Sequence, residues 1–158
     1  KSAEKDIRLK QIISYVVLRH ENSLFSYIRG RQSTERRLVG FHSIGLGGHV
    51  EKIDGSEPSP TREYVHKAAE RELIEEVGLL KPVHKVILAL INDDSSQVGQ
   101  VHFGILHLWD VGKPQIIARE TEIANGAFMP IKDLRRHYDG LEKWSQIALD
   151  IIQDVKIV

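Results

Sequence analysis

One stretch of the chain constrains its fold most. Apolar side chains recur every fourth residue from Val65 to Val77, a spacing typical of an α-helix that buries one face. Ser59 is a suitable N-cap, and Pro60 fits the first helical position. Gly78 suits the left-handed conformation that often follows a helix end. The pattern therefore predicts an amphipathic helix that starts near Ser59 and ends before Gly78.

The segments around this helix are rich in β-branched and aromatic residues, which is typical of buried strands. Strands are expected over residues 11–18, 24–28, 83–91, 98–111 and 127–131, with the first two forming a hairpin, and helical structure is expected over 132–136 and 141–155. Helices that interrupt a series of strands must cover the faces of one sheet. The expected fold class is therefore α/β (α+β), with a mixed β-sheet flanked by helices in a single domain over residues 1–158.

Composition excludes several classes of protein. The 158 residues carry no net charge and no cysteine, which argues against a broadly basic nucleic-acid binder and excludes thiolate metal sites and disulfides. No run of 18 apolar residues is present, so no membrane-spanning helix is expected. A cytoplasmic location is the expectation.

The neutral total conceals an uneven distribution, because residues 51–76 hold 8 acidic and only 4 basic side chains. Glu72, Glu75 and Glu76 fall within an arc of about 100° on the predicted helix. Like charges at these spacings, close to a helix C-terminus, destabilise the helix. A bound cation would reverse both effects, and carboxylate oxygens suit Mg²⁺. The alternative is a solvated acidic face.

The same residues belong to a longer pattern. Residues 71–79 read Arg-Glu-Leu-Ile-Glu-Glu-Val-Gly-Leu, which resembles the second half of the Nudix box, and Glu63 matches the preceding glutamate of that motif. Gly48 resembles the glycine that opens the motif, but 14 residues separate it from Glu63. The box over 48–79 would therefore carry a nine-residue insertion within 51–62.

The resemblance implies a Nudix-type (MutT-type) hydrolase with an α/β/α sandwich fold. Such enzymes use Mg²⁺ or Mn²⁺ to hydrolyse a diphosphate bond in a nucleoside diphosphate linked to another group. It further implies metal binding by Glu72, Glu75 and Glu76, with the backbone carbonyl of Gly48 as an added ligand. Arg71 would orient a glutamate, and Glu63 would belong to the catalytic set. The general base is left open among Glu72, Glu75, Glu120 and Glu122.

Substrate-binding candidates come from a basic stretch before the box. Guanidinium groups bind phosphate bidentately, so the arginines here are candidate phosphate ligands, although a solvated loop is the simpler interpretation: Arg29, Arg31, Arg36 and Arg37. His42, His49 and His102 are expected to be structural. Tyr27 and Phe41 are expected to pack in the core rather than to stack on a base.

Three functions compete. The first is a metal-dependent diphosphate hydrolase, and the second is a non-catalytic Nudix-like binding or regulatory module. The third, isoprenoid diphosphate isomerisation on a related fold, depends on a cysteine that this chain lacks. A small-molecule diphosphate is the expected partner, with a homodimer as one compatible assembly. Nucleoside triphosphates, nucleotide sugars, dinucleoside polyphosphates and non-nucleotide diphosphates all remain open as substrates.

Overall fold

The fold is known from a computed structural model, which describes residues 8–31, 36–55, 61–78, 81–114, 116 and 123–155. Its centre is a seven-stranded mixed sheet with the order β3-β2-β1-β6-β5, in which β4 pairs with β1 and β7 pairs with β2. The strands are β1 (Gln11–His20), β2 (Ser23–Arg29), β3 (His42–Ser43), β4 (Gly45–Leu46), β5 (Pro82–Ile91), β6 (His102–Val111) and β7 (Ile123–Pro130). Only β1 and β6 run parallel among the paired strands.

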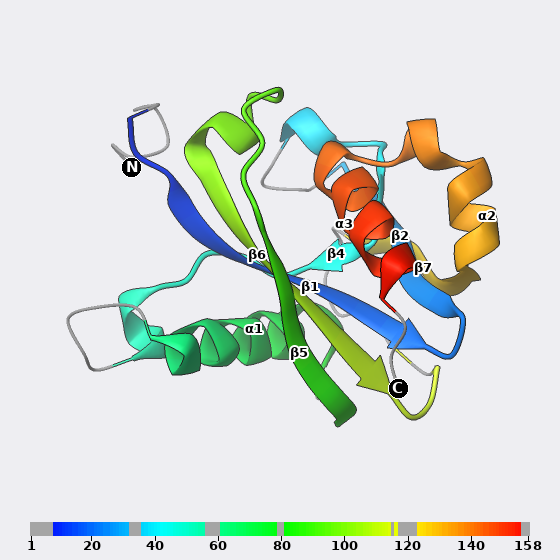
Figure 1. Cartoon of the computed structure of the whole chain (residues 1–158), viewed down its shortest axis with the longest axis horizontal. Coiled ribbons are helices and arrows are strands. Elements are labelled where there is room, and N and C mark those ends of the chain that lie inside the picture. The colour runs from blue at the N-terminus through cyan, green and yellow to red at the C-terminus, as the bar shows by residue number, and fades with distance from the viewer. Residues whose placement is uncertain are drawn as a thin grey trace.

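Helices cover both faces of the sheet (Figure 1). The helices are α1 (Arg62–Val77), α2 (Ile131–Arg136) and α3 (Lys143–Asp154). Alternation along β1 divides the core, since side chains of successive strand residues point to opposite faces. Val16 packs with the α1 side chain Leu73, whereas Val17 packs with Trp144 of α3. The predicted α/β/α arrangement around a mixed sheet is thus confirmed.

Several element boundaries differ from the predictions. Helix α1 begins at Arg62, because the Thr61 hydroxyl caps it by accepting a hydrogen bond from the Tyr64 N–H at 3.4 Å. The prediction of a start near Ser59 was wrong. At its other end Gly78 has a φ of 80°, which confirms the predicted need for glycine there.

The strand predictions were correct in position but not always in length. Strand β6 begins at His102, since residues 99–101 form a short 3-10 helix instead of the expected strand. Strand β7 starts at Ile123, four residues earlier than predicted. Arg29, expected in a loop, is the last residue of β2. No helix among the described residues is long and apolar enough to cross a membrane.

Candidate active site

Three carboxylates lie on the last two turns of α1, as the sequence predicts. Glu72 and Glu76 are partly buried, whereas Glu75 is exposed. Burial raises the pKa of the Glu72 carboxyl, and a hydrogen bond from Arg71 opposes that rise. The helix end thus carries three carboxylates, and carboxylate oxygens are the ligands that a hard divalent cation prefers.

Arg71 fixes this end of the helix to two neighbouring segments. Its Nη1 lies 2.7 Å from Glu72 Oε1, and its Nη2 donates to the His49 carbonyl at 2.9 Å. Its Nε donates to Asp54 Oδ1 at 2.9 Å. Hydrogen bonding to Asp54, with a further contribution from Glu72, raises the pKa of Arg71. The guanidinium is therefore always charged, and it orients Glu72 through charge-assisted hydrogen bonds.

Two glycines bring the backbone against the carboxylates. Gly47 has a φ of 121°, and its N–H donates to Glu76 Oε2 at 2.8 Å. A Cβ on Gly48 would lie 2.7 Å from the Glu72 Cδ, so a larger residue there would displace that carboxylate from its present position. The Gly48 carbonyl accepts a hydrogen bond from the Ser14 N–H at 2.9 Å. A carbonyl oxygen has two lone pairs, so this hydrogen bond does not prevent it from also binding a metal. The role of the Gly48 carbonyl as a metal ligand stays a prediction.

The donor set fits a divalent cation in chemistry. Among the described residues, no group of three or more His, Cys, Asp or Glu side chains is arranged so that it could hold a metal ion. Arg71 and the Gly47 N–H instead hold Glu72 and Glu76. Mg²⁺ typically takes one or two protein carboxylates and completes its shell with waters and substrate phosphates. A partial carboxylate site at the end of α1 therefore fits this ion.

Glu63 lies apart from these groups. Nine residues along a helix amount to a rise of about 13 Å and a rotation of about 180°, so Glu63 and Glu72 are on opposite faces. The Glu63 carboxylate forms an ion pair with Lys67 at 2.8 Å and is 72% exposed. Asp54, in the short 3-10 helix Lys52–Asp54, is instead the second carboxylate that contacts Arg71. Burial opposes its ionisation, but hydrogen bonds from Arg71 and the Glu51 N–H lower its pKa.

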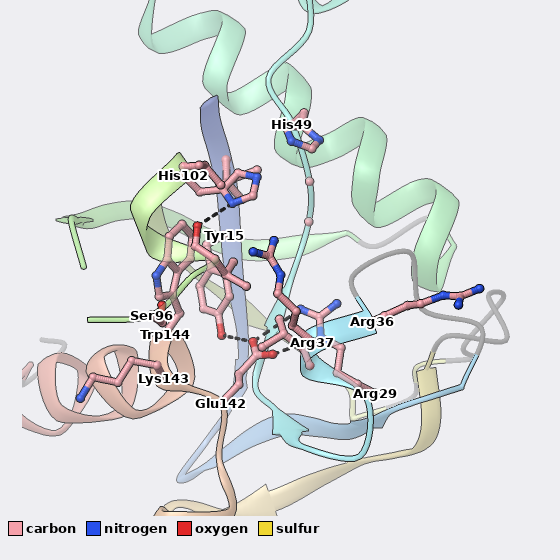
Figure 2. Close-up of a pocket in the computed structure, with 16 residues that line it drawn as sticks. Tyr15, Arg29, Arg36, Arg37, His49, Ser96, His102, Glu142, Lys143 and Trp144 are labelled. Carbon is pink, nitrogen blue, oxygen red and sulfur yellow. Dashed lines mark hydrogen bonds and ion pairs between the residues drawn. The ribbon is translucent and has the colours of Figure 1, made fainter. Parts of the chain in front are cut away.

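A cleft of about 660 Å³ opens beside the two glycines. Figure 2 shows arginines on one side of the cleft and Trp144 with Lys143 on the other, while His49 lies nearest α1. Its lining residues are Ile13, Tyr15, Arg29, Arg36, Arg37, Leu38, Gly47, Gly48, His49, Ser96, Val98, Val101, His102, Glu142, Lys143 and Trp144. Four of these side chains are cationic and only Glu142 is anionic, so the cleft favours an anionic ligand.

A buried network holds one of these arginines in place. Arg29 Nε donates to Glu142 Oε2 at 3.1 Å, and Glu142 Oε1 accepts from the Ser43 hydroxyl at 2.8 Å and the Tyr15 hydroxyl at 3.1 Å. Burial alone would lower the pKa of Arg29, but Tyr27 and Glu142 raise it. Arg29 is therefore a fixed positive charge in the wall of the cleft.

The other sequence candidates divide between the cleft and its surroundings. Arg36 and Arg37 line the cleft, whereas Arg31 is exposed and is not among the lining residues. Glu120 and Glu122, the loop candidates for general base, lie outside the described residues. His49 and His102 lie in the cleft wall with ring centroids 5.4 Å apart, and His102 Nδ1 is hydrogen-bonded to the Val98 carbonyl.

Of the two aromatic candidates, Tyr27 is buried, and its hydroxyl donates to the Gly45 carbonyl, as expected of a core residue. The expectation for Phe41 was wrong, because its side chain is 44% exposed. Phe41 lies in the short connection between the 3-10 helix Arg36–Leu38 and β3. The preceding residue, Gly40, has a φ of 87°.

Sequence reasoning missed Asp54, Glu142 and Lys143. Asp54 lies in the segment interpreted as an insertion, where only its place before a glycine in a mostly polar loop marks it. Glu142 stands at the start of the predicted C-terminal helix, and its contacts reach residues 99 to 127 positions away. No local pattern encodes such contacts.

Comparisons with known proteins connect this geometry to a family. The chain is 38% identical to Protein YmaB of Bacillus subtilis (strain 168) over 157 residues, which span 96% of this chain and 75% of YmaB. Its structure resembles Tm1382, a putative Nudix hydrolase, with a TM-score of 0.77 and 29% identity over 96% of this chain and 74% of that one. No family model matches the sequence.

More distant structures share the fold. The Nudix domain of Shewanella oneidensis NrtR, solved in complex with ADP ribose, has a TM-score of 0.68 at 10% identity, over 92% of this chain and 87% of that one. The MutT protein of Methanosarcina mazei Go1 has a TM-score of 0.63 at 16% identity, over 94% of this chain and 97% of that one. At these identities the likeness shows a shared fold.

Proposed function

The chain belongs to the Nudix (MutT-type) hydrolase family, and on that premise we propose that it hydrolyses the diphosphate bond of a nucleoside diphosphate linked to another group. The proposed cofactor is Mg²⁺ or Mn²⁺, held at the C-terminal end of α1. The observation that carries the proposal is the position of the helix carboxylates beside a cationic cleft, with Gly47 and Gly48 between them.

The proposed ligands of the cation are Glu72, Glu75 and Glu76, with the Gly48 carbonyl as an added ligand. A bound divalent ion neutralises charge on the phosphoryl oxygens and makes the attacking water more acidic. Arg71 orients Glu72, and the Gly47 N–H holds Glu76. Both carboxylates are thus fixed before substrate arrives, which is the preorganisation that catalysis requires.

The cleft supplies the proposed substrate site. Arg29, Arg36 and Arg37 lie on one side of the cleft and Lys143 on the other. Guanidinium groups at such a site can donate to phosphate oxygens. Lys143 joins these arginines as a proposed phosphate ligand, and Arg31, which is not among the lining residues, is a peripheral candidate. The ADP ribose bound by the Nudix domain of NrtR supports a nucleotide as the kind of ligand that this cleft takes.

Some parts of the proposal rest on the sequence alone. The general base is one of Glu72, Glu75, Glu120 and Glu122, and a catalytic part for Glu63 stays a prediction. A homodimer and a cytoplasmic location also stay predictions. The alternative function is a non-catalytic module that binds a nucleotide in the same cleft.

The test is a phosphate-release screen with Mg²⁺ or Mn²⁺ over nucleoside triphosphates, nucleotide sugars, dinucleoside polyphosphates and non-nucleotide diphosphates. We expect turnover that depends on the metal and falls at least about tenfold in Glu75→Gln and in Glu76→Gln, the size of loss typical of a damaged metal site. Glu70→Gln is the matched control, because Glu70 lies on the same helix but pairs with Lys85 on β5.

Two results would contradict the proposal. Equal turnover in wild type and the Glu75 and Glu76 variants would remove the metal site from α1. No turnover in any class, together with tight nucleotide binding, would favour the non-catalytic module.

A further inference from the structure

One imidazole in the wall of the cleft has a fixed orientation. His102, the first residue of β6, lines the cleft and is 8% exposed. Its Nδ1 lies 2.8 Å from the Val98 carbonyl oxygen. A carbonyl only accepts hydrogen bonds, so Nδ1 carries a proton and donates it. Nε2 is therefore the ring nitrogen that remains for a ligand, and Figure 2 shows it turned toward His49, whose ring centroid is 5.4 Å away.

The loop that precedes His102 is held in place on two sides. The buried Asp93 accepts a hydrogen bond at Oδ2 from the Ser96 hydroxyl at 2.9 Å, and the same hydroxyl accepts from the Gly99 N–H at 3.0 Å. Lys10 Nζ donates to the Gly99 carbonyl at 2.8 Å. The imidazole of His102 is thus positioned before a ligand arrives, which lowers the entropy cost of binding one.

An anionic ligand beside such a ring determines which protonation state is favoured. Histidine is the side chain that ordinarily changes charge between about pH 5 and pH 8. A neutral Nε2 would point a lone pair at a phosphate oxygen, whereas an imidazolium Nε2–H donates a hydrogen bond to it. A diphosphate in the cleft therefore favours the protonated ring, since an opposite charge stabilises the charged form.

The other charged groups of the cleft cannot take this role. Arginine and lysine stay protonated near neutral pH, and carboxylates ordinarily titrate near pH 4. His49 follows Gly48, a proposed ligand of the cation, and its carbonyl binds Arg71, which in turn holds Glu72. A divalent cation there disfavours a further positive charge, which leaves His102. The other ionisable lining residues are Arg29, Arg36, Arg37, His49, Glu142 and Lys143.

We propose that His102 binds the diphosphate through Nε2 and takes up a proton as the ligand enters the cleft. The inference rests on the proposed function, because it takes a diphosphate as the ligand of the cleft. The proton comes from solvent, Nε2–H donates to a non-bridging phosphate oxygen, and no covalent bond of the ligand changes. The affinity for the ligand therefore rises as the pH falls, even where the charge of the ligand is constant.

The experiment uses ADP ribose, because both of its phosphates are diesters that keep their charge between about pH 6 and pH 8. Binding is measured by calorimetry without divalent metal, in two buffers that differ in ionisation enthalpy, so that the heat difference reports the protons taken up. Wild type should take up protons at pH 7. Its affinity should fall about fivefold between pH 6.5 and pH 8, within the limit of tenfold per pH unit for one linked proton.

Three variants assign the proton to one ring. His102→Asn retains an N–H that can donate to the Val98 carbonyl but cannot gain a proton in this range. It should take up no proton, and its affinity should change by less than about twofold over the same pH range. His49→Asn should still take up the proton. His84→Asn is the matched control and should behave as wild type, since His84 is 57% exposed on β5 and is not among the lining residues.

A spectrum of the wild type gives the same information without a substitution. Nitrogen-15 chemical shifts of the imidazole distinguish the Nδ1–H tautomer from the imidazolium. Saturating ADP ribose at pH 7 should increase the protonated fraction of His102. An unchanged fraction, no proton uptake by wild type, an uptake that persists in His102→Asn, or no binding of ADP ribose at any pH would each overturn the inference.

Hydrolysis is measured separately, so the two proposals fail separately. A protein that takes up a proton with ADP ribose but turns over no substrate of the screen would retain the role of His102 and lose the proposed function. Metal-dependent turnover without proton uptake on binding would retain the function and lose the role of His102.

Discussion

Two arginine–carboxylate systems border the cleft, and they use the same chemistry for opposite purposes. At the end of α1, Arg71 lies among carboxylates and holds Glu72 and Asp54. At the other end of the cleft, Glu142 lies among donors and holds Arg29. In the first system a positively charged side chain, Arg71, holds carboxylates in place. In the second a negatively charged side chain, Glu142, holds an arginine in place.

The difference explains how the proposed site would attract both a cation and an anion. Arg71 and Glu142 each neutralise part of the charge of the residues that they hold. The exposed charged side chains of each region therefore decide which ion it attracts. Glu75 is exposed beside Arg71, whereas Arg36 and Arg37 are exposed near Glu142. The first region is left acidic and the second basic, although the whole chain has no net charge.

The largest expected effect concerns the stability of the second system. Glu142 is 3% exposed and Arg29 16%, and breaking a buried ion pair costs about 4 kcal/mol because the remaining charge is left without its partner. We expect Glu142→Ala to lower the free energy of unfolding by about that amount, measured by urea denaturation. Asp133→Ala removes the Arg136–Asp133 pair, whose side chains are 73% and 32% exposed, and should change the free energy of unfolding by less than about 1 kcal/mol. Equal effects of the two variants would show that the Arg29–Glu142 pair is not a buried support.

His107 is a buried titratable residue outside both arginine–carboxylate systems, and it provides a contrast with them. His107 is fully buried, and neither of its ring nitrogens has a hydrogen-bond partner among the residues that the structure describes. The ring of His66 on α1 lies 5.3 Å away between ring centroids. Burial, with a smaller contribution from His66, lowers the pKa of His107 from 6.5 to about 4. The unfolded chain therefore binds a proton near pH 6.5 that the folded chain accepts only near pH 4.

Stability should consequently fall as the pH drops from about 6.5 to about 4, and this loss should level off below that range. A difference of 2.5 pKa units corresponds to about 3 kcal/mol. The measurement is urea denaturation across this pH range for wild type and His107→Leu, so that carboxylate effects common to both cancel. Parallel stability curves for the two proteins would contradict the prediction.

The next prediction separates the two arginines by their kinetic effects. Arg71→Ala should lower kcat about 30-fold, because Glu72 loses the group that orients it as a proposed metal ligand. Arg29→Lys keeps the charge that Glu142 requires but loses the bidentate fork. It should therefore raise KM several-fold and leave kcat unchanged, as expected when only ground-state binding is lost. The measurement is steady-state kinetics of both variants on the best substrate of the screen. A higher KM in Arg71→Ala with a lower kcat in Arg29→Lys would contradict the prediction.

The first region could be predicted from sequence because its residues are close in the chain. Glu72, Glu75 and Glu76 share one helix face at fixed spacing, and Gly78 marks the helix end. Of the residues that hold this region in place, Arg71 could be predicted but Asp54 could not, because Asp54 precedes Arg71 by 17 residues in an irregular segment. Glu63 matches the family motif by spacing, yet the helix rotates it away from the carboxylates.

The second region could not be predicted, because tertiary contacts assemble it. Arg29 ends β2, Ser43 lies in β3 and Glu142 precedes α3, so their meeting depends on the strand order of the sheet. The exposure of Phe41 has the same origin. An apolar residue is usually assigned to the core, but Phe41, which directly follows the positive-φ residue Gly40, is 44% exposed.

Metal affinity is the most direct test of the central claim that the carboxylates at the end of α1 form a divalent-cation site. Mn²⁺ binding is measured by electron paramagnetic resonance for wild type, Glu76→Gln and the same-helix control Glu70→Gln. We predict that Glu76→Gln weakens Mn²⁺ binding at least about tenfold, while Glu70→Gln binds as wild type does. Equal affinity of Glu76→Gln and wild type would contradict the account.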